Sequence, residues 1–531
     1  MRILHVGSGF SPYLVSGLVI YADDLMREQS RAGHQVGYLC AGRHYPFLRG
    51  PHLRRWCRAG VTMFEWINSP VVIGRILGSP QPAEDRHQPA CERVMDRVLE
   101  RFAPDVVHLQ DLAGWPSSLI DVAGRANVPC VLTAHDYFTL CPTVRLFDAD
   151  GENCRRLRPG AMCVVCCHSA PFDSEEDRRL TREYHIGQLR RNRAVTFVRP
   201  VLAPMRWAAR TAKARLRARP PVASEAPFQA RAKLNPAAAA EPAPPPAASA
   251  AAHAGALPVH ALPVADAAAY QRRREEGIDH LNRLDRLLVY SDRSGAIFTD
   301  LGVHRARLQK VHVSPRHVVD LRPRSPVQAH LPVRFAALNA MGAIDKGAGL
   351  LVDCVRELDR RGLSGQFELH LHGWARPDLQ DALSPYRHVR VRGRYSTDEL
   401  DGLLEHADVG IVPSLWEEVL GFVGLEFLVK GIPVIGNAVG GIPEYTRDGR
   451  TGWLNRSCTA AGLADIMATL IAEPSRVREM AVSALAVRDD FRRSMPQQAQ
   501  DIVAIYRDVR DNRQAAAGGS SQAKAATPVS R

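Results

Sequence analysis

The 531-residue sequence contains no long hydrophobic run. A membrane-spanning helix needs ~20 consecutive apolar residues, and no stretch of this chain approaches that length. The first residues, Met-Arg-Ile-Leu-His-Val-Gly, lead straight into a strand-like segment, and they lack the apolar core and small-residue cleavage site of a signal peptide. We therefore expect a cytoplasmic protein that is either free or peripheral at the inner face of the membrane.

Composition excludes several other classes of protein. Apolar residues make up 46% and charged residues 24% of the chain, which is ordinary for globular proteins and unlike a collagen, a coiled coil or a wholly disordered chain. The net charge of +13 favours negatively charged partners, such as ligands that carry phosphate, anionic lipid or nucleic acid. The sequence has no motif that interleaves aromatic and basic residues for base recognition, so nucleic acid is not an expected partner.

Two segments depart from globular composition. Residues 196–269 are rich in Ala and Pro and contain few aromatic or β-branched residues, so we expect a mostly disordered insertion. Residues 513–531 are rich in Ala, Gly and Ser and are expected to form a disordered tail. The remainder divides into an N-terminal domain of residues 1–195 and 270–322 and a C-terminal domain of residues 323–512.

Short apolar runs alternate with amphipathic runs of helical length in both domains. This alternation predicts parallel sheets built from right-handed βαβ units, and hence an α/β protein with two doubly wound, Rossmann-like domains that face each other across a cleft. Ligands of such folds bind beyond the carboxyl ends of the strands, so the cleft is the expected site. The predicted strands are 3–6, 35–40, 61–66, 106–109, 130–133 and 287–290 in the first domain and 335–338, 368–371, 389–391, 409–412 and 433–435 in the second. The predicted helices include 21–32, 91–102, 347–361, 397–406, 424–430 and 459–471.

The loop after the first strand, Gly7-Ser8-Gly9-Phe10-Ser11-Pro12, begins like a dinucleotide-binding fingerprint. Pro12 occupies the place of the third glycine, and no acidic residue is obviously placed at the end of the second strand, which argues against NAD. The loop continues to Gly17 and leads into a predicted helix, so its backbone N–H groups could approach a phosphate. A tight turn between strand and helix, without a ligand, explains the same residues.

Two glutamates follow the strand 409–412. Glu418 and Glu426 are separated by seven residues, with Gly421 between them, and a glycine allows close backbone approach. If a helix begins near Gly421, one carboxylate could accept hydrogen bonds from a vicinal ribose diol, and the other could contact sugar hydroxyls or a developing positive charge. Backbone N–H groups at the start of that helix would favour a phosphate. Two solvated glutamates on a surface loop are the alternative interpretation.

The segments around these glutamates resemble glycosyltransferase family 4. In the second half the matching motifs are Pro413-Ser414, Glu418 with Glu426, Gly431-Ile432-Pro433-Val434-Ile435, Gly440-Gly441-Ile442-Pro443-Glu444 and Asp448-Gly449-Arg450-Thr451-Gly452. In the first half they are the loop 12–17, Gly33-His34-Gln35-Val36, Asp105-Val106-Val107-His108 and residues 133–142. Each motif is short, but the ordered set is specific, and it covers nearly everything outside the insertion and the tail.

This resemblance implies a GT-B fold and a retaining, metal-independent hexosyl transfer from a UDP- or GDP-sugar to an acceptor hydroxyl. The N-terminal domain would then bind the acceptor, a glycan or lipid-linked glycan of a surface polysaccharide pathway, and the C-terminal domain would bind the donor. Glu426 matches the glutamate that holds the donor ribose, and Glu418 matches the one beside the transferred sugar and phosphates. His135 matches a histidine that reaches into the cleft, and Lys346 matches a lysine that neutralises the diphosphate.

The resemblance also extends the donor-binding set to Gly17 and Gly421. The sequence departs from the family pattern at several places. The family usually has an Arg a few residues before the lysine, but residues 338–345 contain none. Leu420 and Phe427 replace a usual Phe and a usual Ala. These departures keep open an alternative function, a non-catalytic protein on the same fold that binds a nucleotide sugar or a glycan.

Five cysteines fall between residues 141 and 167. Cys163 and Cys166 have the C-x-x-C spacing of metal ligands, and with Cys141 and Cys154 they could hold a structural Zn²⁺. Reduced, unpaired thiols are the alternative.

Residues 205–219 are predicted to form a short cationic helix. Arg206, Arg210, Lys213 and Arg217 share one face of it, which could rest on an anionic membrane and bring the protein to a lipid-linked acceptor. A solvated arm leading into the insertion is the alternative.

Overall fold

A computed structural model describes residues 1–531 except 12, 15, 46–49, 72–77, 169–264 and 526–531. Met1–Arg182 and Val264–Arg531 form one compact unit. The predicted insertion falls almost entirely outside the described residues, as does the predicted cationic helix of residues 205–219. In the part of the chain that the structure describes, no helix combines the length and the apolar character needed to cross a membrane.

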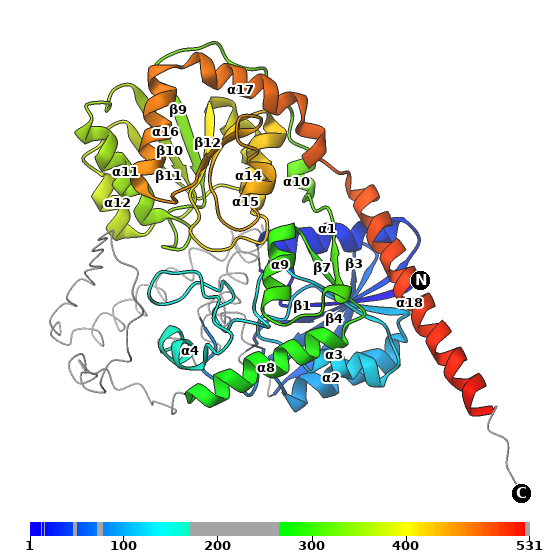
Figure 1. Cartoon of the computed structure of the whole chain (residues 1–531). Coiled ribbons are helices and arrows are strands. Elements are labelled where there is room, and N and C mark those ends of the chain that lie inside the picture. Colours follow the sequence, from blue (N-terminus) through cyan, green and yellow to red (C-terminus); the bar gives the residue numbers. More distant parts are fainter. Residues whose placement is uncertain (12, 15, 46–49, 72–77, 169–264, 526–531) are drawn as a thin grey trace, which may run out of the picture. The chain divides into compact units, whose positions relative to one another are not determined.

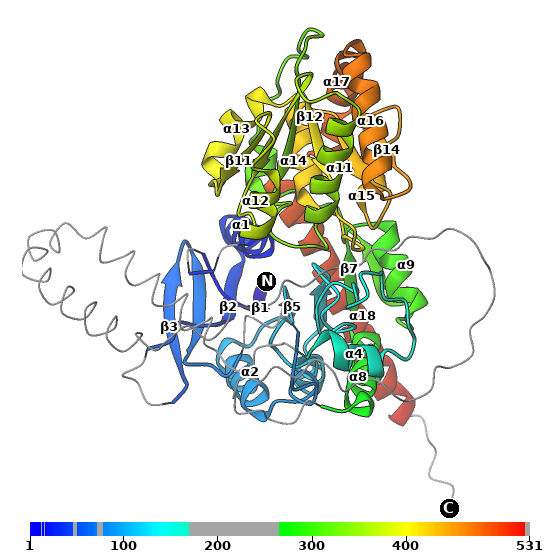
Figure 2. The same cartoon turned by 90° about the vertical axis from the view of Figure 1, so that its left-hand side faces the viewer.

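The first half of the described chain forms a sheet of eight strands in the order β3-β4-β2-β1-β5-β6-β7-β8. Neighbouring strands are parallel except β3 and β4, which pair antiparallel at one edge. Figure 2 shows β3 at this edge and β7 toward the other. The strands are β1 (Arg2–Gly7), β2 (Gln35–Ala41), β3 (His52–Arg58), β4 (Val61–Ile67), β5 (Val106–Leu109), β6 (Cys130–Thr133), β7 (Arg286–Val289) and β8 (Leu308–Lys310).

Helices connect the strands of this first sheet, and local sequence explains where they begin. The Ser16 side chain caps the first long helix by accepting a hydrogen bond from the backbone N–H of Val19. Pro89 stands at the start of the second, where its missing N–H costs nothing. The helices are α1 (Gly17–Arg31), α2 (Pro89–Phe102), α3 (Leu119–Arg125), α4 (Gly160–Cys166), α8 (Ala267–Arg283) and α9 (Asp292–Asp300). The short helix α10 (Arg316–Val319) follows β8 and leads to the second sheet.

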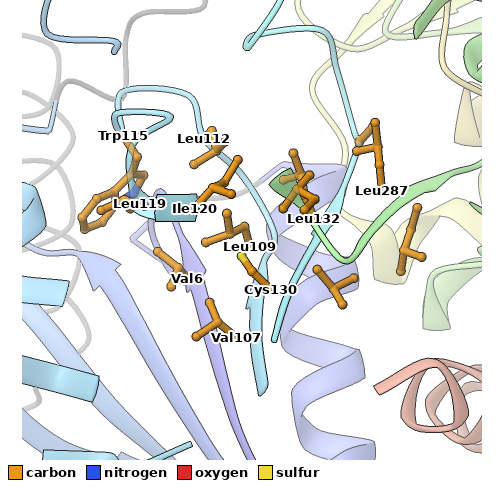
Figure 3. Close-up of a cluster of buried hydrophobic side chains, with 14 of the residues drawn as sticks. Val6, Val107, Leu109, Leu112, Trp115, Leu119, Ile120, Cys130, Leu132 and Leu287 are labelled. Atoms are coloured by element: carbon orange, nitrogen blue, oxygen red, sulfur yellow. The ribbon is translucent and has the colours of Figure 1, made fainter. Parts of the chain in front are cut away.

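The centre of the first sheet is buried on both faces and mostly apolar, as a sheet covered by helices requires. Figure 3 shows part of this core, where Val107 and Leu109 of β5 lie among side chains from β1, β6 and β7. Trp115 and Leu119 close the core from the segment that enters α3, and both are fully buried. Full burial of one such side chain contributes about 1.5–3 kcal/mol, so this core holds the strand ends in place beside the site described below.

The second half forms a parallel sheet of six strands in the order β11-β10-β9-β12-β13-β14 among the described residues. One face packs against α11 and α16, and the other packs mainly against α14, α13 and α10. The strands are β9 (Val333–Leu338), β10 (Phe367–His372), β11 (Val389–Gly393), β12 (Val409–Val412), β13 (Val434–Asn437) and β14 (Gly452–Asn455). The helices are α11 (Ala348–Arg360), α12 (Pro377–Leu383), α13 (Leu400–Leu403), α14 (Phe422–Lys430), α15 (Ile442–Tyr445), α16 (Ala460–Ala472) and α17 (Ser475–Ala486). The predicted fold class, two doubly wound parallel sheets, is confirmed.

The last helix, α18 (Met495–Ala525), corrects two predictions. The sequence predicts that residues 495–512 belong to the C-terminal domain, but Ile502, Tyr506 and Val509 are buried in the core of the first sheet, against α1. Residues 513–531 were expected to be a disordered tail, but the helix continues to Ala525. The Arg513 side chain bonds to Asp285 at 2.9 Å, and the Ala-rich segment beyond it has high intrinsic helix propensity.

Candidate functional site

A cavity of about 850 Å³ lies at the carboxyl ends of strands from both sheets. From the first sheet it is lined by the start of α1, by His135 after β6 and by Tyr290 after β7. From the second sheet it is lined by the loops that follow β9, β10, β11 and β12 and by the first turns of α14. The position matches the rule for open α/β sheets, in which ligands bind beyond the carboxyl edge of the strands.

Lys346 and Glu418 form an ion pair on the wall of this cavity. The Lys346 ammonium donates to Glu418 Oε1, and Ser414 Oγ donates to the same oxygen at 2.7 Å. The Lys346 Nζ atom also lies 5.0 Å from the centroid of the Trp416 ring. The Lys346 side chain is 35% exposed and the Glu418 side chain 9% exposed. The lysine is therefore positioned by a carboxylate and an aromatic face and still presents its charge to the cavity.

Glu426 lies in α14 and is buried, yet it belongs to the cavity wall. Its Oε1 atom is 3.0 Å from Nε2 of His317, a residue of α10 that lines the same cavity. Its Oε2 atom has no hydrogen-bond partner among the described residues. Such a buried carboxylate oxygen is an acceptor that a ligand hydroxyl could satisfy.

Two helices begin at the cavity. Gly17 is the first residue of α1, and a Cβ atom placed on it would lie 3.2 Å from the ring of Phe422, so a larger residue would crowd the entrance of α14. Gly421 is the N-cap of α14 and has a φ of 86°, a left-handed conformation that favours glycine. The free N–H groups and the positive end of each helix dipole favour an anion here.

His135 reaches the cavity from the loop after β6, and its ring nitrogens lie 2.8 Å (Nδ1) and 3.1 Å (Nε2) from the Tyr290 hydroxyl. Burial lowers the pKa of His135 to about 3, so the imidazole is neutral near neutral pH. The adjacent Asp136 is partly buried, and burial together with the charge of Asp111 raises its pKa to about 7. His135 can therefore act at neutral pH through hydrogen bonds and not through a positive charge.

The loop that carries Glu418 is tied to the first sheet by Glu417. Its carboxylate accepts from Arg293 Nε at 3.0 Å and from Arg155 Nη2 at 2.7 Å. Burial raises the pKa of Glu417, but the two arginines outweigh it and hold the pKa below its ordinary value. Glu417 therefore stays charged and fixes the backbone next to Glu418 through charge-assisted hydrogen bonds.

Several cavity residues are not indicated by the sequence motifs. The cavity is also lined by His317 after β8, by Trp374 after β10 and by Arg394 and Tyr395 after β11. Met341 stands five residues before Lys346, within the stretch where an Arg is usual, and it is buried. Among the described lining residues, Arg394 is the second strong cation beside Lys346. The signal in the sequence is a basic residue directly after Gly393, just beyond the predicted strand 389–391.

The structure describes all four cysteines of the predicted zinc site, and the site stays a prediction. No set of three or more His, Cys, Asp or Glu side chains in the described part of the chain is arranged to hold a metal ion, and Cys141, Cys154, Cys163 and Cys166 are free. Cys163 packs against Tyr270, whereas Cys141 bonds to Thr143 at 3.2 Å. Burial raises the pKa of Cys166 to about 12.

Comparison with known families gives two matches along the chain. The model of Glycosyltransferase Family 4 matches residues 15–220, and the model of Glycosyl transferases group 1 matches residues 334–473. The chain is 28% identical over 170 residues to alpha-D-kanosaminyltransferase of Streptomyces kanamyceticus, which covers 32% of this chain and 44% of that protein. It is 33% identical over 172 residues to D-inositol 3-phosphate glycosyltransferase of Mycobacterium sp. strain KMS, covering 32% of this chain and 37% of that protein. The matched part thus spans less than half of the length of these two curated relatives.

Solved structures resemble the chain over nearly its whole length. Sucrose-phosphate synthase from Thermosynechococcus elongatus superposes with a TM-score of 0.56 at 14% identity, covering 96% of this chain and 98% of that one. The UDP-forming alpha,alpha-trehalose-phosphate synthase from Burkholderia xenovorans superposes with a TM-score of 0.53 at 10% identity, covering 95% and 99%. One family model covers most of the first half and the other most of the second, in the expected order, and the fold is shared with these structures, so the chain belongs to glycosyltransferase family 4 and has the GT-B fold.

Proposed function

We propose that this protein transfers a hexosyl unit from a nucleotide sugar to an acceptor hydroxyl and retains the configuration at the anomeric carbon. The observation that carries the proposal is the convergence of Lys346, Glu418 and Glu426 on one cavity at the carboxyl ends of the strands. The names of the curated relatives, among them an alpha-D-kanosaminyltransferase and D-inositol 3-phosphate glycosyltransferases, support glycosyl transfer as the reaction class.

The donor is proposed to be a UDP- or GDP-sugar bound against the second sheet. Its diphosphate would lie between the Lys346 ammonium and the start of α14, where the charge and the free N–H groups both favour an anion. Negative charge grows on the diphosphate as the bond from the sugar breaks. A positioned donor aimed at that charge supplies about 2.7–4 kcal/mol of transition-state stabilisation.

The reaction would break the bond between the anomeric carbon and the diphosphate oxygen and form a bond from that carbon to the acceptor oxygen on the same face. The acceptor proton would pass to the departing diphosphate, so atoms and charge balance without a further reactant. Glu418 would meet the sugar hydroxyls and the positive charge that develops on the ring, and neutral His135 would hydrogen-bond the sugar from the first sheet. The acceptor is proposed to be a surface polysaccharide or lipid-linked glycan, reached in the cytoplasm or at the inner face of the membrane.

A second function is favoured by one observation. Buried Met341 lies within the stretch where the family usually has a cationic Arg, so part of the usual diphosphate clamp is missing. A protein with this change could bind a nucleotide sugar or a glycan without transferring the sugar. Arg394, on the cavity wall, is the residue that could replace the missing cation.

A donor screen with one matched pair of variants tests the proposal. The protein is incubated with UDP- and GDP-hexoses, and release of the nucleoside diphosphate is measured with and without glycan acceptors. For the active donor, Lys346→Ala is expected to lower kcat about 100- to 1,000-fold. Arg360→Ala, which removes an exposed cation of α11 that pairs with Glu357, is the control and should leave kcat unchanged.

The non-catalytic function would be favoured if the protein bound a nucleotide sugar tightly but released no nucleoside diphosphate with any acceptor tested. Failure to bind any of these donors would overturn both.

A further inference from the structure

A second, much smaller pocket lies at the ends of β5 and β6, and we call it the acidic pocket. Its volume is about 20 Å³, which is room for one group the size of a water molecule. Because β5 and β6 are parallel neighbours, Gln110 and Asp111 after β5 meet Asp136 after β6 at the same edge of the sheet, and all three line the pocket. His135 lines both this pocket and the larger cavity, so a group bound in the pocket is next to the cavity.

The two carboxyl groups of the acidic pocket are bonded to neutral donors. Asp111 accepts hydrogen bonds from Ser8 Oγ and from the backbone N–H of Ala113. Asp136 Oδ1 accepts from the Phe138 N–H at 2.8 Å, and Asp136 Oδ2 has no partner among the described residues. A buried carboxylate is normally paired with a cation, because burial of an unpaired charge is costly. The acidic pocket therefore lacks a positive charge.

Two arginines near Asp136 are each held by another carboxylate. Arg273 Nε is bonded to Asp85 at 2.5 Å, and Arg145 Nη1 is bonded to Asp345 at 2.9 Å. Burial, the main cause, raises the pKa of Asp136 to about 7 although the charges of both arginines act against the rise. The arginines of the chain therefore do not supply the cation that Asp136 lacks.

Gln110 gives independent evidence for a ligand in the acidic pocket. Its side chain is fully buried, and its Nε2 atom lies 2.9 Å from His5 Nδ1 and 3.0 Å from His108 Nδ1. Its Oε1 atom has no hydrogen-bond partner among the described residues. Buried polar atoms of folded proteins are normally satisfied. The acidic pocket thus offers several oxygen acceptors, and a group that fits it brings several donors and a positive charge.

We propose that the acidic pocket binds the ammonium group of the acceptor, so that this protein glycosylates a hydroxyl of an amino sugar or an aminocyclitol. The inference rests on the proposed function, since it names the chemical class of the acceptor. An ammonium group is about the size of a water molecule, carries three N–H donors and brings the missing charge. A metal ion fits less well, because no set of three or more His, Cys, Asp or Glu side chains in the described part of the chain is arranged to hold one.

The alternative is that Asp136 keeps a proton near neutral pH and that the acidic pocket holds only a water molecule. The pocket would then distinguish poorly between an ammonium group and a hydroxyl group. The two cases therefore differ in whether an acceptor with an amine binds more tightly than its neutral counterpart.

The test measures acceptor binding by calorimetry to the chain saturated with UDP or GDP. Methyl glucosaminide is compared with methyl glucoside, and 2-deoxystreptamine is compared with myo-inositol. The wild type is expected to bind each amine about 10- to 100-fold more tightly than its neutral counterpart, and Asp136→Asn should remove most of that preference. Asp96→Asn, the same substitution in α2 and outside the lining of the pocket, should keep all of it. Thermal unfolding of each variant checks that it is folded.

The inference is overturned if the wild type binds the amines no more tightly than their neutral counterparts, or if Asp136→Asn keeps the same preference as Asp96→Asn. In that event the proposed function stands, because release of nucleoside diphosphate from the donor tests it separately. If the chain binds neither UDP nor GDP and releases neither from their hexoses, the proposed function fails and the acceptor assignment fails with it.

Discussion

Asp136 combines two influences that both oppose its negative charge. It is partly buried beside the cavity, and Asp111 adds a second carboxylate nearby, so its pKa rises from 3.8 to about 7. A hydrogen bond from the Phe138 N–H at 2.8 Å offsets part of this rise. A carboxyl group that holds its proton near neutral pH can donate a hydrogen bond as well as accept one.

Asp136→Asn is expected to flatten the dependence of folding stability on pH. In the wild type the folded state holds more protons than the unfolded state between pH 3.8 and about 7, so the free energy of unfolding falls as pH rises through that window. The asparagine cannot titrate. Between pH 3.8 and about 7, the free energy of unfolding of the variant should therefore fall by roughly 1–3 kcal/mol less than that of the wild type. Urea unfolding at several pH values measures the difference.

Asp378→Asn is the control for this experiment. The pKa of that exposed carboxyl is held below its ordinary value by the Arg376 side chain, so it lies outside the window and the slope should not change. Equal slopes for Asp136→Asn and the wild type would contradict the burial account of Asp136.

The sequence predicts those cavity residues that are charged and also belong to a recognisable motif. Lys346, Glu418 and Glu426 stand at fixed spacings after strand ends, and the structure places all three on one cavity. His317 escapes such reasoning because its partner Glu426 is 109 residues away and the contact exists only after the second sheet has folded. The contact between Cys163 and Tyr270, which is far away in sequence, escapes it for the same reason.

At the scale of single elements, α14 depends on two glycines. Gly421 supplies the left-handed turn at its start, and Gly424 lets Tyr445 of α15 pack directly on its backbone. A Cβ atom at Gly424 would fall on the Tyr445 ring. Tyr445 is fully buried and has no room to retreat, so the helix that carries Glu426 would have to shift.

Gly424→Ala is therefore expected to lower the free energy of unfolding by about 1–3 kcal/mol, because it overpacks a buried contact. Gly349→Ala is the matched substitution in α11, where a Cβ atom meets nothing within 4 Å. It should raise stability by about 0.5–1 kcal/mol, since alanine reduces the entropy lost on folding. Denaturant midpoints of both variants measure the contrast, and equal stability of the two would refute this packing account.

Strands and helices that contain a strong apolar run can be predicted from this sequence, whereas elements that lack such a run cannot. The predicted strands 106–109, 130–133 and 409–412 coincide with β5, β6 and β12. The strand β3 was missed because its residues are mostly polar and it pairs at a sheet edge, where one neighbour suffices. The predicted helix 397–406 forms as two 3-10 turns around the short α13, in a stretch that includes Gly402.

At the scale of the whole molecule, α18 follows the second sheet in sequence but packs with the first. A buried polar network fastens it there. The Tyr506 hydroxyl lies 2.5 Å from His108 Nδ1 and accepts from Gln29 Nε2 at 3.3 Å. His108 also bonds to Thr133 at the end of β6, two residues before His135. Burial lowers the pKa of His108 well below its ordinary value, so the network is neutral.

Tyr506→Phe is expected to lower the free energy of unfolding by about 1–3 kcal/mol, because the buried Gln29 Nε2 atom loses its partner and His108 Nδ1 keeps only Gln110, while the volume barely changes. Tyr386→Phe, at a partly buried tyrosine of the second half, should change stability by less than about 0.5 kcal/mol. Chemical denaturation compares the two, and a loss of the same size in both variants would show that the network does not fasten α18.

The position of α18 also constrains the order of events during synthesis. A ribosome delivers the strands of the first sheet early, but the residues that cover part of its core, Met495 to Val509, emerge after both sheets have been made. Until then the nascent N-terminal half carries an uncovered apolar strip beside α1, the kind of surface that chaperones recognise. Premature termination shortly before residue 495 would leave that strip bare for good, and such fragments would aggregate even though every strand of both sheets had been synthesised.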